Sequence, residues 1–270
     1  MIYDAKNGDV SIGNTKMDYI TFGRGEENLI LIPGLGDGLK TVKGTAAMMA
    51  IMFRKYSKRY KVYVFSRTRE IAEDYTIKDM AKDQKEAMEK LNISKSNFVG
   101  ISQGGMIAQH MALDYPELVE KLVLCVTAAR PNETMRDVLN VWSTMAKAND
   151  YRSLFIDMIE KSYTEKYKKR YRLLYPILTR VGKPKDFNRF LIQAKAITHH
   201  DIYGELEKIK CPTFVIGAEL DEIIGKESSE EIAEKIKNSK LLIYEGLGHG
   251  AYEEAKDFSQ QVLAFLNPQS

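Results

Sequence analysis

Short apolar runs alternate with longer amphipathic segments along most of this chain. The apolar runs cover residues 28–32, 61–65, 96–101, 121–127, 212–217 and 240–244. Each is nearly continuous in hydrophobic residues, as expected of strands covered on both faces. Near the start, residues 9–12 and 16–22 flank a short turn at 13–15 and predict a hairpin. The alternation predicts strand–helix units around a mostly parallel, twisted sheet with helices on both faces.

The amphipathic segments predict helices over residues 44–57, 76–91, 103–115, 225–236 and 252–266. Residues 76–91 show the clearest pattern, because apolar side chains recur at helical spacing and only Gln84 on that stripe is polar. Thr76, followed three residues later by Asp79, resembles a capping box at the start of this helix.

Residues 132–200 interrupt the alternation with helical, tyrosine-rich sequence that contains no clear strand. The interruption follows the C-terminal end of a strand, where ligand sites of open α/β sheets lie. We therefore predict a core domain formed by residues 1–131 and 201–270, and a helical cap (lid) insertion formed by 132–200. The insertion carries a net charge of +7 and the rest of the chain −4. Such a charge run usually marks solvated helix faces, and it could also attract anionic substrates.

A stripe of tyrosines lies within the predicted cap. Tyr163, Tyr167, Tyr171 and Tyr175 follow one another at steps of four residues, with Leu174 and Leu178 close by. This spacing favours one helix face, which either packs on the main domain or lines an apolar pocket for the acyl part of a substrate. The four tyrosines are therefore candidate substrate-binding residues.

The composition narrows the class of protein. A chain of 270 residues with 44% hydrophobic and 29% charged residues can bury a core, which excludes disordered and fibrous classes. No basic start with an apolar run and no stretch of 18 apolar residues occurs, so we expect a cytoplasmic protein without a membrane span. Cys125 and Cys211 are expected to be buried thiols, and no Cys/His spacing predicts a metal site. The net charge of +3 and the absence of a recognition motif argue against nucleic acid, and we expect a monomer or homodimer.

The segment from Gly100 to Gly104 reads Gly-Ile-Ser-Gln-Gly and matches G-x-S-x-G. A predicted strand ends at 101 and a predicted helix starts at 103, so Ser102 sits on a sharp strand-to-helix turn that exposes its hydroxyl. Glycines two residues before and after let the backbone approach itself closely. We therefore predict Ser102 as a nucleophile.

A serine nucleophile needs a base and a group that orients the base. Of the four histidines, His249 lies in a glycine loop after the last strand, whereas His110, His199 and His200 fit structural or solvated roles better. The acid should follow the strand at 212–217, where Asp221 lies between Glu219 and Glu222; position alone does not decide among them. The N–H of Gln103 and a backbone N–H from the loop after 28–32, for which we choose Leu35, should form the oxyanion hole.

The chain resembles the α/β-hydrolase superfamily over nearly its whole length, and most of all its small capped esterases, haloperoxidase-like hydrolases and enol-lactonases. The resemblance rests on residues 29–38, 98–125, 211–225 and 244–254, with 98–125 (FVGISQGGMIAQHMALDYPELVEKLVLC) the most specific. It implies Ser102 as nucleophile, Asp221 as acid and His249 as base, in the chain order of this superfamily, with Leu35 and Gln103 as oxyanion donors. Two departures occur: Pro33-Gly34 stands where many members have His-Gly, and residues 66–68 replace D-x-R-G-x-G.

These features predict a serine esterase that cleaves a small carboxylic ester through an acyl-enzyme, without a metal or organic cofactor. An acyltransferase, a thioesterase, a lactonase or a C–C bond hydrolase would use the same triad. A non-catalytic ligand-binding protein on the same fold is the alternative of another class, and retention of all three triad residues argues against it.

Overall fold

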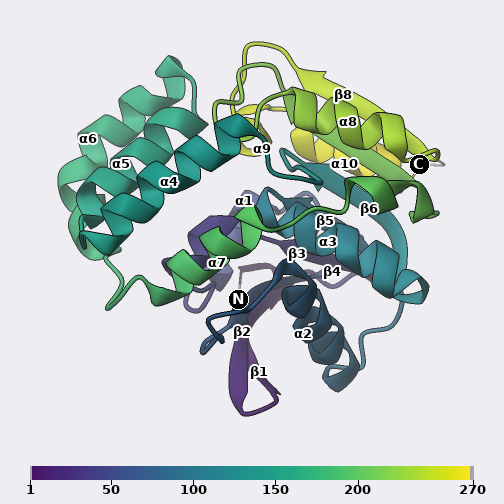
Figure 1. The fold of residues 1–270 in the computed structure, drawn as a ribbon. Coiled ribbons are helices and arrows are strands. Elements are labelled where there is room, and N and C mark those ends of the chain that lie inside the picture. Colours follow the sequence, from purple (N-terminus) through teal and green to yellow (C-terminus); the bar gives the residue numbers. More distant parts are fainter. Residues whose placement is uncertain (1, 268–270) are drawn as a thin grey trace.

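The computed structural model describes residues 2–267, which form one eight-stranded sheet with helices around it (Figure 1). The strands are β1 (Lys6–Ile12), β2 (Thr15–Phe22), β3 (Glu27–Ile32), β4 (Tyr60–Thr68), β5 (Ser96–Ile101), β6 (Val119–Cys125), β7 (Thr213–Ala218) and β8 (Ser239–Tyr244). They lie in the order β1-β2-β4-β3-β5-β6-β7-β8. The pairs β1–β2 and β2–β4 are antiparallel, and all later neighbours are parallel. The predicted hairpin and the mostly parallel sheet are therefore confirmed.

The central strands are buried because their sequences are nearly continuous in apolar residues. Every residue of β5 and β7 is buried, as is required of strands with helices on both faces. The predicted strand at 121–127 ends earlier, at Cys125, because Val126 has a φ of 42° and leaves the extended conformation. The first residue after β5 and the first after β6 thus both have positive φ at the same edge of the sheet.

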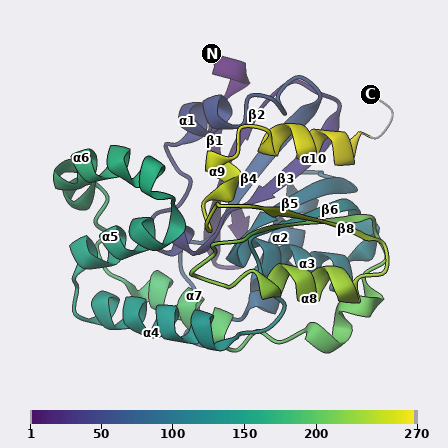
Figure 2. The same cartoon turned by 90° about the horizontal axis from the view of Figure 1, so that it is seen from above.

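Helices cover both faces of the sheet (Figure 2). One face carries α1 (Ala46–Met52), α9 (Ala251–Glu254) and α10 (Phe258–Leu266), and the other carries α2 (Ile77–Lys90), α3 (Gln103–Asp114) and α8 (Glu227–Lys235). The predicted capping box is present, since Thr76 and Asp79 exchange side-chain-to-backbone hydrogen bonds at 3.1 and 2.9 Å. The single helix predicted at 252–266 is wrong, because Ala255 is extended (ψ 115°) and separates α9 from α10. The helix predicted at 44–57 is limited to α1.

Four α-helices and the 3₁₀ helix η4 (Tyr203–Lys208) lie between β6 and β7, and the described residues of this stretch form no strand. The α-helices are α4 (Glu133–Lys147), α5 (Tyr151–Ser162), α6 (Glu165–Val181) and α7 (Asn188–Thr198). The helices α4, α5 and α6 stand together to one side of the sheet, with α6 at the outside in both views (Figures 1 and 2). In contrast, α7 lies against the chain that follows β3, where the 3₁₀ helix η2 (Leu35–Gly38) is found.

Candidate active site

Ser102 occupies the turn between β5 and α3 in a strained backbone conformation. Its φ of 53° and ψ of −122° lie in a region that residues other than glycine rarely adopt. A serine before a helix normally caps the first N–H groups, but the Ser102 hydroxyl makes no capping hydrogen bond. The turn itself is held by backbone: Ser102 N donates to Cys125 O at 2.9 Å, and Ser102 O accepts from Thr127 Oγ1 at 2.7 Å. The strained turn therefore leaves the hydroxyl free.

The glycines around Ser102 are required by close backbone contacts. A Cβ atom at Gly104 would lie 2.0 Å from Ile32 O, and one at Gly100 would lie 2.5 Å from Gly104 O. No side chain can be accommodated at such distances without moving the strand or the helix. The motif G-x-S-x-G thus has the physical role expected from the sequence.

Asp221 and His249 are brought together from the loops after β7 and β8. His249 Nδ1 donates to Asp221 Oδ2 at 2.8 Å, and both side chains are buried. The other carboxylate oxygen, Oδ1, accepts from the backbone N–H groups of Ile223 and Ile224 at 2.9 and 3.0 Å. These bonds fix the carboxylate and leave Nε2 of His249 as the free ring nitrogen.

The geometry also identifies which of the three acids, Glu219, Asp221 or Glu222, faces the imidazole. Glu219, the other candidate with a defined partner, accepts from Gly246 N at 2.8 Å and supports the loop that precedes His249. Asp221 alone among the three acids is bonded to the imidazole. Within residues 2–267 the hydroxyl of Ser102 forms no hydrogen bond with His249, so the contact between nucleophile and base stays a prediction.

The loop after β3 passes directly beside Ser102. A Cβ atom at Gly34 would lie 3.2 Å from Ser102 Cβ and 3.6 Å from its Oγ. Leu35 and Gln103 are the first residues of η2 and α3, and the first N–H groups of a helix have no acceptor within it. Two helix N-termini with unused donors therefore flank the hydroxyl, which suits developing negative charge.

A buried polar network that the sequence did not reveal supports this loop. Arg67 is fully buried at the end of β4, and its Nη2 donates to Gln103 Oε1 at 2.7 Å. Asp37, in η2, accepts from Arg67 N at 3.1 Å and from Arg189 Nη2 at 2.9 Å, while its carbonyl accepts from Arg189 Nη1 at 2.7 Å. Burial lowers the pKa of the Arg67 guanidinium to about 10, against the attraction of Asp37, which raises it.

This network also connects α7 to both candidate oxyanion donors. The Gln103 side chain donates from Nε2 to Gln193 O at 3.0 Å, and Arg189 reaches Arg67 O and Thr68 O as well. In the sequence, Arg67 stands out only as a charged residue directly after the predicted strand at 61–65. Its partners lie 30 to 122 positions away and could not be inferred from spacing.

The tyrosine stripe does not form one helix face, so that expectation is wrong. Tyr163 is the residue at which α5 ends, and α6 starts only at Glu165. The rings of Tyr163, Tyr167 and Tyr171 still stack, with centroids 4.9 to 5.6 Å apart. Tyr175 turns away and donates to Glu160 Oε1 on α5 at 2.9 Å.

Tyr163 packs on the loop that carries His249. Gly250 N donates to Ser162 O at 2.7 Å, and a Cβ atom at Gly250 would lie 2.3 Å from the Tyr163 ring. Next to this contact, burial raises the pKa of the Glu253 carboxyl, although hydrogen bonds from Tyr163 and Tyr252 lower it. Glu253 was not among the residues singled out from the sequence, because an acid in a surface-like helix gives no distinguishing signal.

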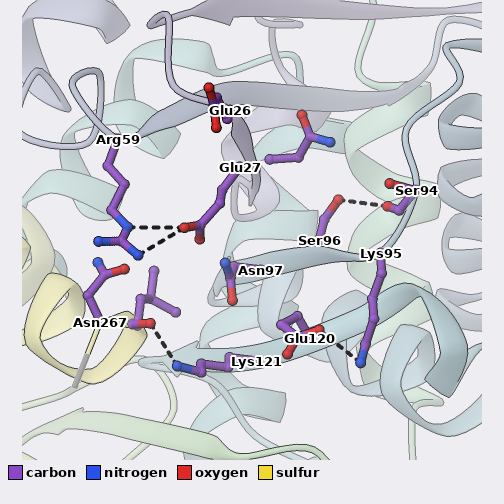
Figure 3. A pocket seen from close by; sticks show the side chains of 12 residues that line it. Glu26, Glu27, Arg59, Ser94, Lys95, Ser96, Asn97, Glu120, Lys121 and Asn267 are labelled. Carbon is purple, nitrogen blue, oxygen red and sulfur yellow. Dashed lines mark hydrogen bonds and ion pairs between the residues drawn. The ribbon is translucent and has the colours of Figure 1, made fainter. Parts of the chain in front are cut away.

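A cavity of about 820 Å³ lies at the edge of the sheet where the parallel strands start (Figure 3), whereas Ser102 follows the end of β5. Residues at the starts of β3, β5 and β6 line it. Its charges pair with one another, Arg59 with Glu27 at 2.9 Å and Lys95 with Glu120 at 2.8 Å. No histidine lines this cavity, and its serines, Ser94 and Ser96, are not the strained Ser102, so it is not the candidate active site.

The structure also tests what was expected of the two cysteines, of a metal site and of a membrane-spanning helix. Cys125 is buried and Cys211 partly buried; both are free, and burial raises the pKa of each thiol. Within residues 2–267 no group of three or more Asp, Glu, His or Cys side chains is arranged to hold a metal ion. Among the same residues, no helix has the length and apolar character needed to cross a bilayer.

Comparison with known proteins gives a consistent picture. A family model described as the alpha/beta hydrolase fold matches residues 28–256. A putative carbamate hydrolase, RutD, from Caulobacter vibrioides is 24% identical over 90% of this chain and 91% of its own length. A 2-hydroxy-6-oxononadienedioate/2-hydroxy-6-oxononatrienedioate hydrolase from a Pseudomonas species is 26% identical over 69% of this chain and 68% of its own.

Solved structures agree with the fold. MGS-M2, an alpha/beta hydrolase enzyme from a Medee basin deep-sea metagenome library, superposes with a TM-score of 0.83 at 23% identity, covering 97% of this chain and 98% of its own. The enol-lactonase from Burkholderia xenovorans LB400 gives a TM-score of 0.82 at 23% identity, covering 96% and 99%. At this level of identity the likeness concerns the fold.

Proposed function

Because this chain belongs to the α/β-hydrolase fold family, we propose that it is a serine hydrolase that cleaves a small carboxylic ester through an acyl-enzyme on Ser102. The observation that carries the proposal is the strained Ser102, whose hydroxyl makes no capping bond and lies between two helix N-termini. A glycine at position 102 would adopt the same backbone conformation with less strain, so the strain brings no structural benefit. It is explained if position 102 must carry a hydroxyl.

The proposed reaction uses each group in a defined role. His249 Nε2 accepts the hydroxyl proton while Ser102 Oγ attacks the ester carbonyl carbon, and the N–H groups of Leu35 and Gln103 hold the resulting oxyanion. His249 then returns the proton to the leaving alkoxide, which departs as the alcohol. Water, deprotonated by His249, attacks the acyl-enzyme, and His249 passes this proton to Ser102 Oγ as the bond to the acyl group breaks and the acid is released. The Asp221 carboxylate stabilises the imidazolium in both halves of the reaction.

We also propose that residues 132–200 act as a cap over this centre, with residues 1–131 and 201–270 as the core domain. Two contacts support it: Ser162 O meets the His249 loop, and Gln193 O meets the side chain of Gln103. Tyr163 is then the tyrosine best placed to meet a bound acyl group, since it lies beside Gly250. The rings of Tyr167 and Tyr171 stack on Tyr163, and Tyr175 forms a hydrogen bond with Glu160 of α5.

Turnover of p-nitrophenyl esters tests the proposal. We expect Ser102→Ala to lower kcat by several orders of magnitude, because no acyl-enzyme can form. Ser96→Ala is the matched control: this serine starts the same strand at its far end and donates to Ser94 O. Unchanged turnover in Ser102→Ala would remove Ser102 from the mechanism. Complete inactivity of the wild-type protein, with no labelling by a fluorophosphonate probe, would favour a non-catalytic binding protein.

The fold does not determine the substrate class, which is identified by measuring turnover of a panel of candidate substrates. The relatives are named for carbamate and for carbon–carbon bond hydrolysis, so the panel includes a carbamate and a vinylogous 1,5-diketone beside esters, thioesters and lactones. We expect the highest kcat/KM with a small ester. A higher kcat/KM with another compound of the panel would leave the proposed triad unchanged but would replace the small ester as the substrate. Transfer of the acyl group to an added alcohol would identify an acyltransferase.

A further inference from the structure

The outer face of α6 is an unusual surface for a water-exposed helix. Leu173 is 82% exposed, the highest value among the large hydrophobic residues exposed in the described part of the chain, and Ile177 is 60% exposed. Leu174 beside them is also exposed. Single exposed hydrophobic residues are common, but three that adjoin on one helix face form a patch.

Cations continue this face on both sides of the patch. Lys166, Arg170, Leu173, Ile177 and Arg180 follow one another at alternating steps of four and three, and all are exposed. Such spacing places them on one side of a helix with 3.6 residues per turn. An apolar centre with basic ends is the arrangement of helices that lie flat in the surface of a membrane.

The cations of this face have no acidic partner in the structure. Lys166, Arg170 and Arg180 form no ion pair within residues 2–267, and neither does the neighbouring Lys169. The acid at the start of α6, Glu165, is already shared by Lys168 and Arg172 at 2.8 and 2.9 Å. The face is therefore positively charged without compensation, and α6 itself stands on the outer side of the molecule (Figure 2).

We propose that the outer face of α6 docks on anionic lipid surfaces, with Leu173 and Ile177 entering the interface and the cations contacting headgroups. Charge selects this occupant. A second copy packed symmetrically on the same face would set these cations against their own equivalents, which is repulsive. Nucleic acid would match the charge but leave the aliphatic side chains in water. Because α6 belongs to the proposed cap, docking would hold the cap at the membrane surface.

Co-sedimentation of the full chain with vesicles tests this without any substrate, so its result is independent of the proposed ester hydrolysis. The vesicles are phosphatidylcholine alone or phosphatidylcholine with phosphatidylglycerol, at low and at physiological salt. We expect binding only when phosphatidylglycerol is present, and weaker binding as salt rises.

Three double variants separate the contributions. Lys166→Gln with Arg170→Gln should lower the partition coefficient about 30-fold, at about fivefold per cation. Leu173→Ser with Ile177→Ser should lower it at least about tenfold. The control, Met48→Ser with Met52→Ser on α1, removes two hydrophobic residues that are 55% and 43% exposed and should bind as the wild type does.

Two results would overturn the proposal. One is the absence of binding to phosphatidylglycerol vesicles, or equal binding to both kinds of vesicle. The other is a loss in the α1 control as large as in the α6 variants. Circular dichroism of each variant shows whether it is folded, and since all six positions are exposed, folding should be unaffected.

Discussion

Replacement of Arg189 by Gln should damage both the stability and the catalytic centre of this protein. Arg189 donates four hydrogen bonds: to the Asp37 carboxylate and carbonyl, and to the carbonyls of Arg67 and Thr68. Asp37 belongs to η2, which begins at the proposed oxyanion donor Leu35. Arg189 therefore fixes the position of that donor through Asp37.

The expected loss of stability follows from the charges that lie together around Asp37. The Asp37 carboxylate forms an ion pair with Arg189 and attracts the guanidinium of Arg67, so these three groups together carry one net positive charge. Removing Arg189 leaves the neutral pair of Arg67 and Asp37, and we expect a loss of about 3 kcal/mol, the low end for breaking a buried ion pair. Asp37→Asn leaves the buried Arg67 and the partly buried Arg189 without an anion, so it should cost more, about 5 kcal/mol.

The effect on catalysis should appear in kcat. Misplacing one oxyanion donor costs about 10²–10³ in rate, because that interaction is strongest in the transition state. Stability is measured by urea unfolding and activity by p-nitrophenyl ester kinetics. Arg152→Gln, an exposed arginine on α5, is the control and should change stability by less than about 0.5 kcal/mol. An Asp37→Asn variant that is as stable as Arg189→Gln would refute the charge argument.

Three further predictions concern single positions. Asp221→Asn should keep the fold and lower kcat by about 10⁴, because an amide favours the wrong tautomer of His249; a loss below tenfold in steady-state kinetics would count against the triad. Gly104→Ala should unfold at clearly lower urea because its Cβ would lie 2.0 Å from Ile32 O, whereas Gly204→Ala, with open space around it, should not. The raised pKa of Glu253 means that the folded state holds this proton more tightly than the unfolded state. Wild-type stability should thus fall relative to Glu253→Gln as pH rises above about 4.5, and parallel Tm profiles would contradict this.

The local parts of the site could be predicted from the sequence, and the long-range parts could not. The turn at Ser102 was predictable because a buried strand, two glycines and a helix start follow one another within a few residues. The sequence also placed His249 in a glycine loop after β8. It could not choose Asp221 over its acidic neighbours, because the choice depends on which carboxylate faces the imidazole. Likewise, Arg67 and Arg189 meet Asp37 only after the sheet and α7 have formed.

The tyrosines illustrate a different failure. Their spacing of four residues predicted one helix face, but Tyr163 ends α5 and Tyr175 is drawn to Glu160. A spacing of four residues shows which positions would share a helix face, but it does not show where a helix begins. Here Thr164 is the N-cap of α6, so Tyr163 lies outside that helix. The Glu254 carboxylate accepts from both Thr164 N and Thr164 Oγ1, at 2.9 and 2.6 Å. The start of α6 is therefore set by a residue 90 positions away.

The central claim is that the hydroxyl at position 102 is the nucleophile, and mass spectrometry of the protein after reaction with a fluorophosphonate tests it most directly. We predict one adduct per chain, located by peptide mapping on Ser102, and much slower labelling in His249→Gln than in His199→Gln, whose exposed histidine bonds only to its own helix end. An adduct on another residue, or esterase activity that persists in protein without any adduct at Ser102, would contradict the account.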